Sequence, residues 1–425
     1  MGGVSAGMTG PTPVERSSLR RVLANRNFAR LFTAGILSIS GRAIYSLAIT
    51  WAVFIVTGSA LDVAWVAIAQ IVGSIVFSLP AGVWVDSFNR KRLMVLSDVV
   101  RAGAVGAFAI YTALVGFNLY LVLGITFLVT GFTTIFQPAE RAILPMLLGK
   151  EDLGHANGLV NSSRYIVQAV ANSVGGALVV TVGVVTGLLY NSATFVLSAL
   201  LVATVIVAVP QALPETGAGS KGRTLSEIKE GFRWLIRSGT GLFELTLSST
   251  FLNVFSTIVW TFLVVYATLS IHGDAFTFGV LLASLTVGYG VGSLAVGLTR
   301  ATRHAGIVWV VFGGMVPGIA VAGAAVLPDT WVAFPLIVVF GLTTGFAGVT
   351  WLTTAQTIVP SNVQGRYYAL DGMISWAAIP AAEVMGALLI DALGINPTFL
   401  IAGIGLIATG AVGSLNSTLR GLRVP

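Results

Sequence analysis

Twelve long apolar runs restrict the fold of this chain more than any other feature. Each run exceeds the roughly 20 residues that a helix needs to cross the hydrocarbon core of a bilayer. Only 9% of the residues are charged, whereas about 25% are charged in an average soluble protein. The sequence therefore predicts an all-α polytopic membrane protein, with spans at roughly residues 31–57, 61–84, 93–116, 119–146, 157–183, 187–209, 242–271, 275–298, 306–327, 331–358, 363–390 and 394–415.

The positions of Lys and Arg support this count and predict the orientation. Cations that flank membrane spans stay on the cytoplasmic side. If both termini are cytoplasmic, the six outer connections contain no Lys or Arg. The cations gather in the tails and inner connections, at Arg16 to Arg30, Arg90 to Arg92, Lys150, Lys221 to Arg237, Arg300 to Arg303, Arg366 and Arg420 to Arg423. We read the net charge of +7 as a topology signal rather than a nucleic-acid-binding surface, and expect both termini in the cytoplasm.

One long hydrophilic segment divides the chain into two six-helix halves. The predicted parts are a cytoplasmic tail (1–27), a first bundle (28–209), a cytoplasmic linker (210–240), a second bundle (241–415) and a cytoplasmic tail (416–425). From Thr224 onward, apolar residues of the linker recur at helical spacing. This predicts a short amphipathic helix on the inner leaflet.

Small residues recur in the same register in both halves. The matching glycines are Gly58, Gly73 and Gly82 with Gly273, Gly288 and Gly297, each pair 215 residues apart, and Gly176 with Gly386, 210 apart. Two parallel six-helix repeats form an architecture of secondary transporters, in which the substrate site lies between the repeats near the midplane.

A short charged run joins the second and third predicted spans. It contains Gly82, Asp86, Arg90, Lys91 and Arg92. A glycine allows close helix approach, a carboxylate can accept hydrogen bonds at a helix N-terminus, and the three cations can pair with acids across a cavity mouth. The run could therefore act as a cytoplasmic gate. The alternative is a positively charged anchor that only fixes topology.

These residues resemble the signature loop of the major facilitator superfamily, Gly-x-x-x-Asp followed by a basic cluster. Three further stretches, Asn25–Phe32, Phe136–Pro145 and Glu151–Leu159, resemble the drug:proton antiporter branch that includes macrolide and siderophore exporters. The resemblance implies two pseudo-symmetric six-helix bundles in a prokaryotic cell membrane. It also implies proton-coupled efflux of a small lipophilic or amphiphilic compound by alternating access.

Two departures from the family pattern keep other functions open. Asn172 stands where the antiporter pattern of the fifth helix has a proline, and Ala301 occupies the aspartate position of the second-half loop. Symport or facilitated uptake of a small solute is therefore an alternative, and a transport-inactive membrane scaffold or sensor is a second one.

Ionisable residues inside the spans are further candidates, because burying a charge is costly unless it is paired or hydrated. Arg42 lies near mid-depth of the first span, where it could bind an anionic group of a substrate or form a structural ion pair. Proton coupling needs a carboxylate that alternates between neutral and charged forms. Glu383 in the eleventh span is the first candidate and Asp371 the second, although either could instead be a hydrogen-bonded acid at a helix interface.

The remaining candidates are polar residues of the predicted spans. We expect Glu140, Arg141 and Arg164, at inner helix ends, to pair with the charged loop and complete the gate. The substrate cavity is predicted to include Gln70, Gln137, Gln168, Asn253 and Gln356, although each could only join two helices by hydrogen bonds.

Metal and cofactor chemistry are not expected. The chain has no cysteine, and its three histidines are scattered near predicted loops. We therefore predict no metal site, no cofactor and no catalytic residues, hence a transporter rather than an enzyme. Its expected partners are a small-molecule substrate, protons and membrane lipids, with the protein acting as a monomer.

Overall fold

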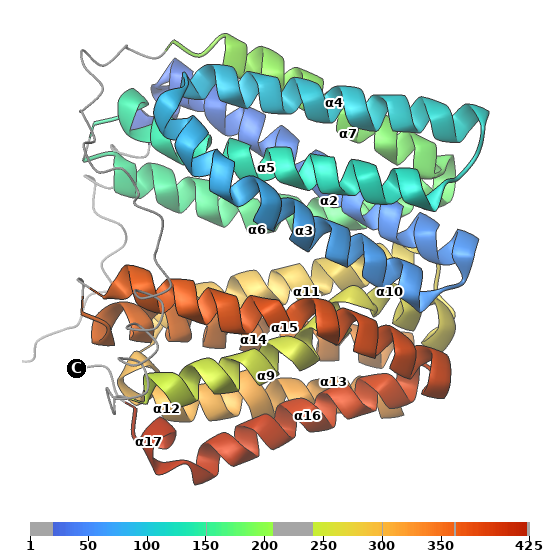
Figure 1. Ribbon diagram of the computed structural model, residues 1–425, viewed down its shortest axis with the longest axis vertical. Coiled ribbons are helices and arrows are strands. Elements are labelled where there is room, and N and C mark those ends of the chain that lie inside the picture. Colours follow the sequence, from blue (N-terminus) through green and yellow to red (C-terminus); the bar gives the residue numbers. More distant parts are fainter. Residues whose placement is uncertain (1–19, 150, 207–240, 300, 361–362, 423–425) are drawn as a thin grey trace, which may run out of the picture.

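Helices that lie roughly parallel to one another make up the protein (Figure 1). The computed structural model describes residues 20–149, 151–206, 241–299, 301–360 and 363–422. Within these residues there is no strand, and twelve helices are long and apolar enough to cross a membrane. The prediction of an all-α, twelve-span protein is confirmed.

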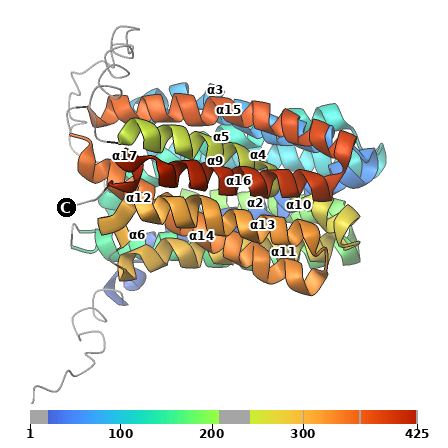
Figure 2. The same ribbon diagram turned by 90° about the horizontal axis from the view of Figure 1, so that it is seen from below.

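The first six spanning helices form one half of the molecule and the last six form the other (Figures 1 and 2). The first half contains α2 (Arg26–Thr57), α3 (Ala60–Ser87), α4 (Arg90–Leu114), α5 (Leu119–Leu147), α6 (Leu153–Val182) and α7 (Val184–Ala203). The second contains α9 (Leu242–Thr261) with its continuation α10 (Leu263–Val265), α11 (Ala275–Ala295), α12 (Ala305–Val308) continuing through a π segment into α13 (Val316–Val326), α14 (Thr330–Ile358), α15 (Gln364–Leu393), α16 (Ile395–Leu415) and the short α17 (Ser417–Arg420). The helix expected from Thr224 lies outside the described residues.

The two halves use the same devices at corresponding places, which supports the internal repeat. Gly183 joins α6 directly to α7, Gly394 joins α15 directly to α16, and both have a φ of +87°, a conformation that favours glycine. Gly73 of α3 packs against the backbone of α5, and Gly288 of α11 packs against the backbone of α14. The repeated glycines therefore bring corresponding helices together.

The described connections fall at two ends of the bundle. The end that carries the start of α2, residues 88–89 and α17 is called here the terminal end. The other end, which carries Gly58, Gly183 and Gly394, is called the far end. At the terminal end Arg21 makes an ion pair of 2.7 Å with Asp152, and Asn25 donates a hydrogen bond of 3.0 Å to the carbonyl of Leu147. Phe28, Phe136 and Ala156, one from each stretch that carries the family resemblance, share a buried hydrophobic cluster.

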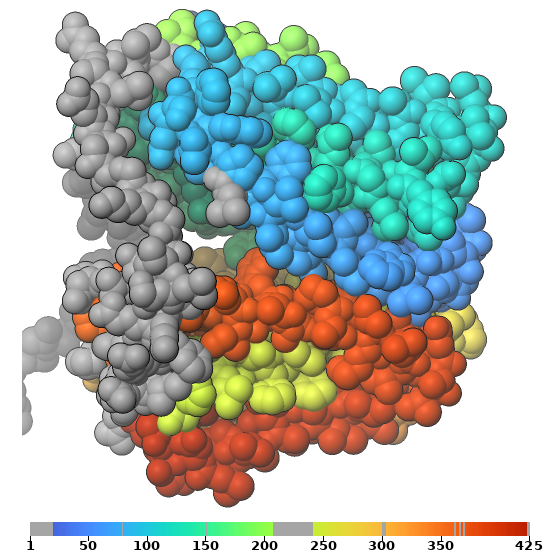
Figure 3. Space-filling model, viewed as in Figure 1, coloured from blue at the N-terminus to red at the C-terminus, as the bar shows by residue number. Residues whose placement is uncertain are grey.

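Contacts between the halves concentrate toward the far end. A Cβ atom on Gly176 would lie 2.5 Å from the carbonyl oxygen of Ala275, so α6 and α11 approach backbone to backbone. The rings of Trp51 and Phe278 stack with centroids 6.4 Å apart. In the space-filling view a hollow separates the halves near the terminal end, and they meet toward the far end (Figure 3).

Candidate functional site: a central cavity and its buried charges

A cavity of about 430 Å³ lies between the two halves. Six helices supply its walls, namely α2, α3, α5, α6, α9 and α11. Most of the lining comes from the first half, and the second half adds Trp260, Thr261, Phe278, Leu282 and Thr286. A site between two six-helix repeats is the arrangement expected of a secondary transporter.

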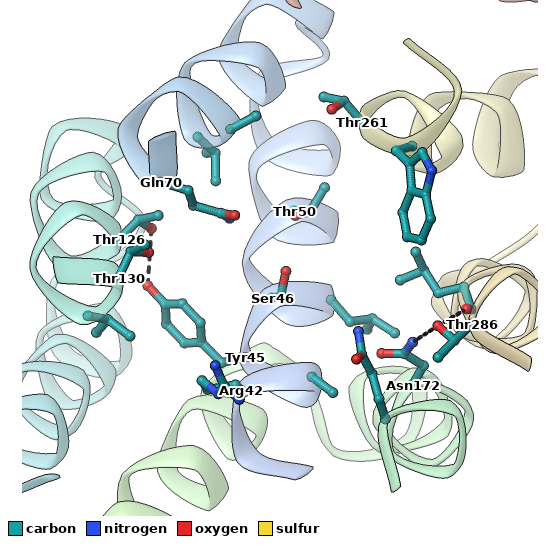
Figure 4. A pocket seen from close by; sticks show the side chains of 18 of the residues that line it. Arg42, Tyr45, Ser46, Thr50, Gln70, Thr126, Thr130, Asn172, Thr261 and Thr286 are labelled. Atoms are coloured by element: carbon teal, nitrogen blue, oxygen red, sulfur yellow. Dashed lines mark hydrogen bonds between the residues drawn. The ribbon is translucent and has the colours of Figure 1, made fainter. Parts of the chain in front are cut away.

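The cavity wall combines hydroxyl and amide groups with aromatic rings. Tyr45 and Thr126 share a hydrogen bond of 3.1 Å across α2 and α5. Asn172 donates a hydrogen bond of 3.4 Å to Thr286, which links the two halves (Figure 4). Asn172, at the position of the family's proline, therefore bridges α6 and α11. A wall of this kind suits a ligand that is part polar and part apolar.

Arg42 is the one charged residue among the described residues that line this cavity. Its Nε donates a hydrogen bond of 3.4 Å to the carbonyl of Ser38. It also lines a second cavity of about 730 Å³, together with Gln137 and Arg141. The predicted cavity residues Arg42, Gln70 and Gln137 thus lie on these two cavities.

Two other predicted cavity residues lie elsewhere in this conformation. Gln356 is exposed near the terminal end of α14, where its carbonyl accepts a hydrogen bond of 3.0 Å from Gln364. Asn253 is exposed on α9, seven residues before Trp260 and hence on the same face of the helix. Because Asn253 is nearly two helical turns closer to the terminal end, it lies outside the described cavity. In this conformation neither Gln356 nor Asn253 lines a described cavity, whereas the predicted Gln168 lines the central one. The roles of Gln356 and Asn253 in substrate binding stay predictions.

Glu383 of α15 is buried directly behind the cavity wall. Its side chain is 3% exposed, and the hydroxyl of Thr261 donates a hydrogen bond of 2.8 Å to Oε1. No described group hydrogen-bonds to Oε2. Since Thr261 itself lines the cavity, a single hydroxyl separates this carboxyl group from the space a ligand would occupy.

Asp371 lies on the same helix, twelve residues or about 18 Å closer to the terminal end. It is 7% exposed, and its Oδ1 has no hydrogen-bond partner among the described residues. It lines none of the described cavities. The two predicted coupling acids therefore differ, because Glu383 adjoins the cavity and Asp371 does not.

Among the described residues, no hydrogen bond or ion pair joins the charged loop to the second half. Arg90 donates to the carbonyl of Ala142 at 3.4 Å, which ties it to α5 of its own half. Asp86 is exposed and forms no ion pair with any described residue. Asn89, not Asp86, caps α4 by accepting a hydrogen bond of 3.1 Å from the amide of Arg92. Asp86 therefore does not cap α4 in this conformation, and its role in the gate stays a prediction.

The other gate candidates also stay within the first half. A Cβ atom on Gly82 would meet nothing within 4 Å, so no helix approaches this glycine here. Glu140, Arg141 and Arg164 line a pocket of about 210 Å³ among α2, α5 and α6. Glu140 forms no ion pair with any described residue. In this conformation Glu140 is therefore not paired with the loop cations Arg90 to Arg92.

A buried ion pair in α4 escaped the sequence analysis. Asp98 and Arg101 are both 0% exposed and contact each other through Oδ1 and Nη2. Ser198 donates a hydrogen bond of 2.7 Å to Asp98, and Arg101 donates one of 3.1 Å to Thr133. The Arg101 guanidinium also lies 4.3 Å from the ring centroid of Phe195. The signal was an acid and an arginine three residues apart within an apolar run, which places both on one helix face.

Solved structures of known proteins share this fold. The chain superposes on a nucleoside transporter, NupG, with a TM-score of 0.75 at 11% identity, covering 92% of this chain and 99% of that one. It also superposes on a bacterial homologue of the iron transporter ferroportin in an inward-facing state, with a TM-score of 0.67 at 15% identity, covering 91% and 96%. The fold is that of major facilitator superfamily transporters.

Sequence comparison identifies the family within that class. The profile of the family described as transmembrane secretion effector matches residues 18–422, and the chain belongs to this family of major facilitator superfamily transporters. It is 25% identical to the multidrug efflux pump Tap of Mycolicibacterium fortuitum over 93% of this chain and 95% of the relative. It is also 25% identical to macrolide efflux protein A of Streptococcus pyogenes, over 93% and 97%. The chain is thus a multi-pass membrane transport protein.

Proposed function

We propose that this protein exports a small amphiphilic compound across a prokaryotic cell membrane by alternating access, in exchange for protons. The observation that carries the proposal is the place of Glu383, a buried carboxyl group one hydroxyl away from the central cavity. Export as the direction is inferred from the relatives, which include a multidrug efflux pump and a macrolide efflux protein.

In the proposed alternating-access cycle, the conformation described here corresponds to the inward-open state. Arg26, Arg90 and Arg420 stand at the terminal end, at the ends of α2, α4 and α17, so that end is proposed to face the cytoplasm. The hollow near the terminal end would admit substrate from the cytoplasm, while the α6–α11 contact and the Trp51–Phe278 stack close the far end. Rocking of the two halves would then open the far end around a fixed site.

The gate residues are proposed to act in the opposite state. In the conformation described here Asp86 has no ion-pair partner and the space beside Gly82 is open. Closing the terminal end would bring the second half against Gly82 and the loop cations, with Glu140 and Arg141 completing the gate. The loop would thus stabilise the outward-open state only.

Glu383 is proposed to carry the proton. The Thr261 hydroxyl donates a hydrogen bond to Oε1 of Glu383 in this state. Oε2, which has no hydrogen-bond partner among the described residues, can accept a proton. In an exchange cycle Glu383 would take up a proton when the cavity faces outward and release it when the cavity faces the cytoplasm. Because Thr261 lines the cavity, its hydroxyl would respond both to a bound substrate and to protonation of Glu383. Asp371, which lines none of these cavities, is proposed to have no part in coupling.

Inside-out vesicles that contain the full chain test this proposal. With each member of a panel of acidic, neutral and basic lipophilic compounds as the probe, an imposed proton gradient (acidic lumen) should drive the accumulation of at least one of them, and a protonophore should abolish this accumulation. Glu383→Gln should lose the gradient dependence but retain exchange of labelled for unlabelled probe. Asp371→Asn, on the same helix, is the matched carboxylate control and should keep gradient-driven transport.

Three outcomes would contradict parts of the proposal. Wild-type-like coupled transport by Glu383→Gln would exclude this residue as the coupling site. Gradient-driven movement in the reverse direction would support uptake instead of export. No transport of any member of a broad panel of lipophilic compounds would favour a scaffold or sensor.

A further inference from the structure

The cavity contains a guanidinium group that has no carboxylate of its own. No carboxylate oxygen of the described residues lies within 4.0 Å of the Arg42 guanidinium. Among these residues, its one hydrogen bond goes to the backbone carbonyl of Ser38. A charge at this depth is costly unless it is paired or hydrated. The structural ion pair that the sequence left open for Arg42 is therefore not formed.

The surrounding charges do not neutralise Arg42. The described charged groups that act on it are Arg101, Arg164, Glu140 and Asp98. Asp98 is occupied by its ion pair with Arg101, and Glu140 forms no ion pair with any described residue. The three arginines therefore outnumber the two acids, and Arg42 is the one of the three that lines the central cavity.

The second cavity extends this positive surface toward the terminal end. It is lined by Arg42, by Arg141, and by the α5 residues Thr130, Thr134 and Gln137. The spacing of the α5 residues, 130, 134, 137 and 141, places them on one face of that helix. Two guanidinium groups thus lie at the ends of this cavity, and hydroxyl and amide groups line the path between them. Such a path attracts an anion and guides it inward.

The side of the central cavity opposite Arg42 carries aromatic rings. Arg42 and Thr261 lie on opposite sides of the cavity in the close view (Figure 4). Next to Thr261, Trp260 presents an indole ring, and Phe278 adds a second aromatic surface. The cavity therefore offers a cation at one side and aromatic rings at the other.

We propose that the central cavity selects anionic amphiphiles, that is, compounds with an aromatic or hydrocarbon body and one acid group, and that Arg42 binds the acid group. The acid would complete the ion pair that the protein itself leaves open, and the body would lie against Trp260 and Phe278. This inference rests on the proposed transport function and names the substrate class of the same cavity.

Binding of a matched charge series to the purified full chain tests the proposal without requiring transport. The probes are radiolabelled naphthalene-acetate, its neutral amide naphthalene-acetamide, and naphthylethyl-ammonium. Binding is measured by equilibrium dialysis with the protein in neutral-lipid nanodiscs, and empty discs give the background. Wild type should bind the acetate in preference to both other probes.

Variants at Arg42 separate a binding role from a structural one. Arg42→Gln should weaken acetate binding about tenfold or more, as expected for loss of a charge-assisted hydrogen bond, and leave amide binding unchanged. Arg42→Lys should retain part of the preference for the acid. Arg141→Gln should slow acetate binding at low salt more than it changes the affinity, because it acts on the path.

Three results would contradict the proposal. An acid preference that persists in Arg42→Gln, or ammonium binding as tight as acetate binding in wild type, would contradict it. Equal loss of acetate and amide binding in a folded Arg42→Gln protein would assign Arg42 a structural role. Any of these results would leave the vesicle assay for proton-driven export standing, so failure of the substrate class is distinguishable from failure of the transport proposal.

Discussion

The two halves of this protein treat buried charge in opposite ways. The first half places Asp98 against Arg101 in a fully buried pair and adds Arg42 at the cavity. In the described part of α9 to α16 no Lys or Arg is buried, and neither of the buried acids Glu383 and Asp371 forms an ion pair with a described residue. A carboxylate paired with an arginine is held ionised, whereas one with neutral partners can gain a proton without stranding a countercharge. We therefore expect the buried charges of the first half to stay ionised throughout transport, and the buried acid Glu383 of the second half to gain and lose a proton.

Removal of Arg101 should have the largest effect on stability. Arg101→Ala would leave Asp98 buried without a countercharge, which costs about 3–5 kcal/mol of unfolding free energy. The double variant Asp98→Leu with Arg101→Met should recover most of this loss, because an apolar pair of similar size needs no charge compensation. Thermal unfolding of the purified proteins measures both effects. An Arg101→Ala protein as stable as wild type would show that the pair does not fix charge in the first half.

Equivalent glycines in the two halves should respond differently to a side chain. A Cβ atom on Gly176 would meet the backbone of Ala275 in the other half, whereas one on Gly386 would meet Phe262 within the same half. Gly176→Val should therefore force α6 and α11 apart and open the far end, and Gly386→Val should not. Gly103→Val, where an added Cβ meets nothing within 4 Å, is the control.

Cysteine labelling can measure this difference, because the natural chain has no cysteine. Thr50→Cys places one thiol on the cavity wall. An impermeant reagent applied from the far-end side should label it several-fold faster in the Gly176→Val background only. Equal labelling in all three glycine backgrounds would contradict the assignment of the α6–α11 contact as the far-end closure.

The charged loops of the two halves offer a further comparison. Asp86 belongs to the first-half loop, and Ala301 occupies the corresponding position in the second. Because Asp86 has no ion-pair partner among the described residues here, Asp86→Asn should leave probe binding unchanged but slow transport severely. Ala301→Asn should change neither. Normal transport by Asp86→Asn would reduce the loop to a topology anchor.

The smallest effect is expected at the bridge between the halves. Asn172→Leu removes a long hydrogen bond to Thr286, and such bonds between membrane helices contribute about 0.6 kcal/mol on average. Thermal unfolding should shift only slightly, and cysteine labelling from the far side should increase modestly. A loss as large as that of Arg101→Ala would mean that this bridge, and not the α4 pair, dominates stability.

The architecture was accessible from sequence because it depends on properties that are local along the chain. Span length, cation position and glycine register predicted the twelve helices and the repeat, and Gly73 and Gly288 indeed occupy equivalent helix contacts. The starts of helices were less predictable, since a single cap such as Asn89 brings the charged residues of the loop into α4.

The site was only partly accessible for a different reason. Arg42 and Glu383 stood out because an ion in an apolar run is rare, but their partners depend on which helices meet. Thr261 is 122 positions from Glu383 in sequence, and no local pattern connects them. Asn253 and Gln356 line neither cavity in this conformation, because polarity alone does not give the depth of a residue along its helix.

Side-by-side transport measurements on Arg42→Gln and Glu383→Gln test the central claim most directly. Each variant is reconstituted in proteoliposomes, and gradient-driven net transport and exchange of labelled for unlabelled naphthalene-acetate are recorded in the same preparation. We predict that Arg42→Gln loses both activities, whereas Glu383→Gln loses net gradient-driven transport and keeps exchange. If Glu383→Gln keeps gradient-driven transport, or if both variants lose the same activities, the division of roles between the two halves is contradicted.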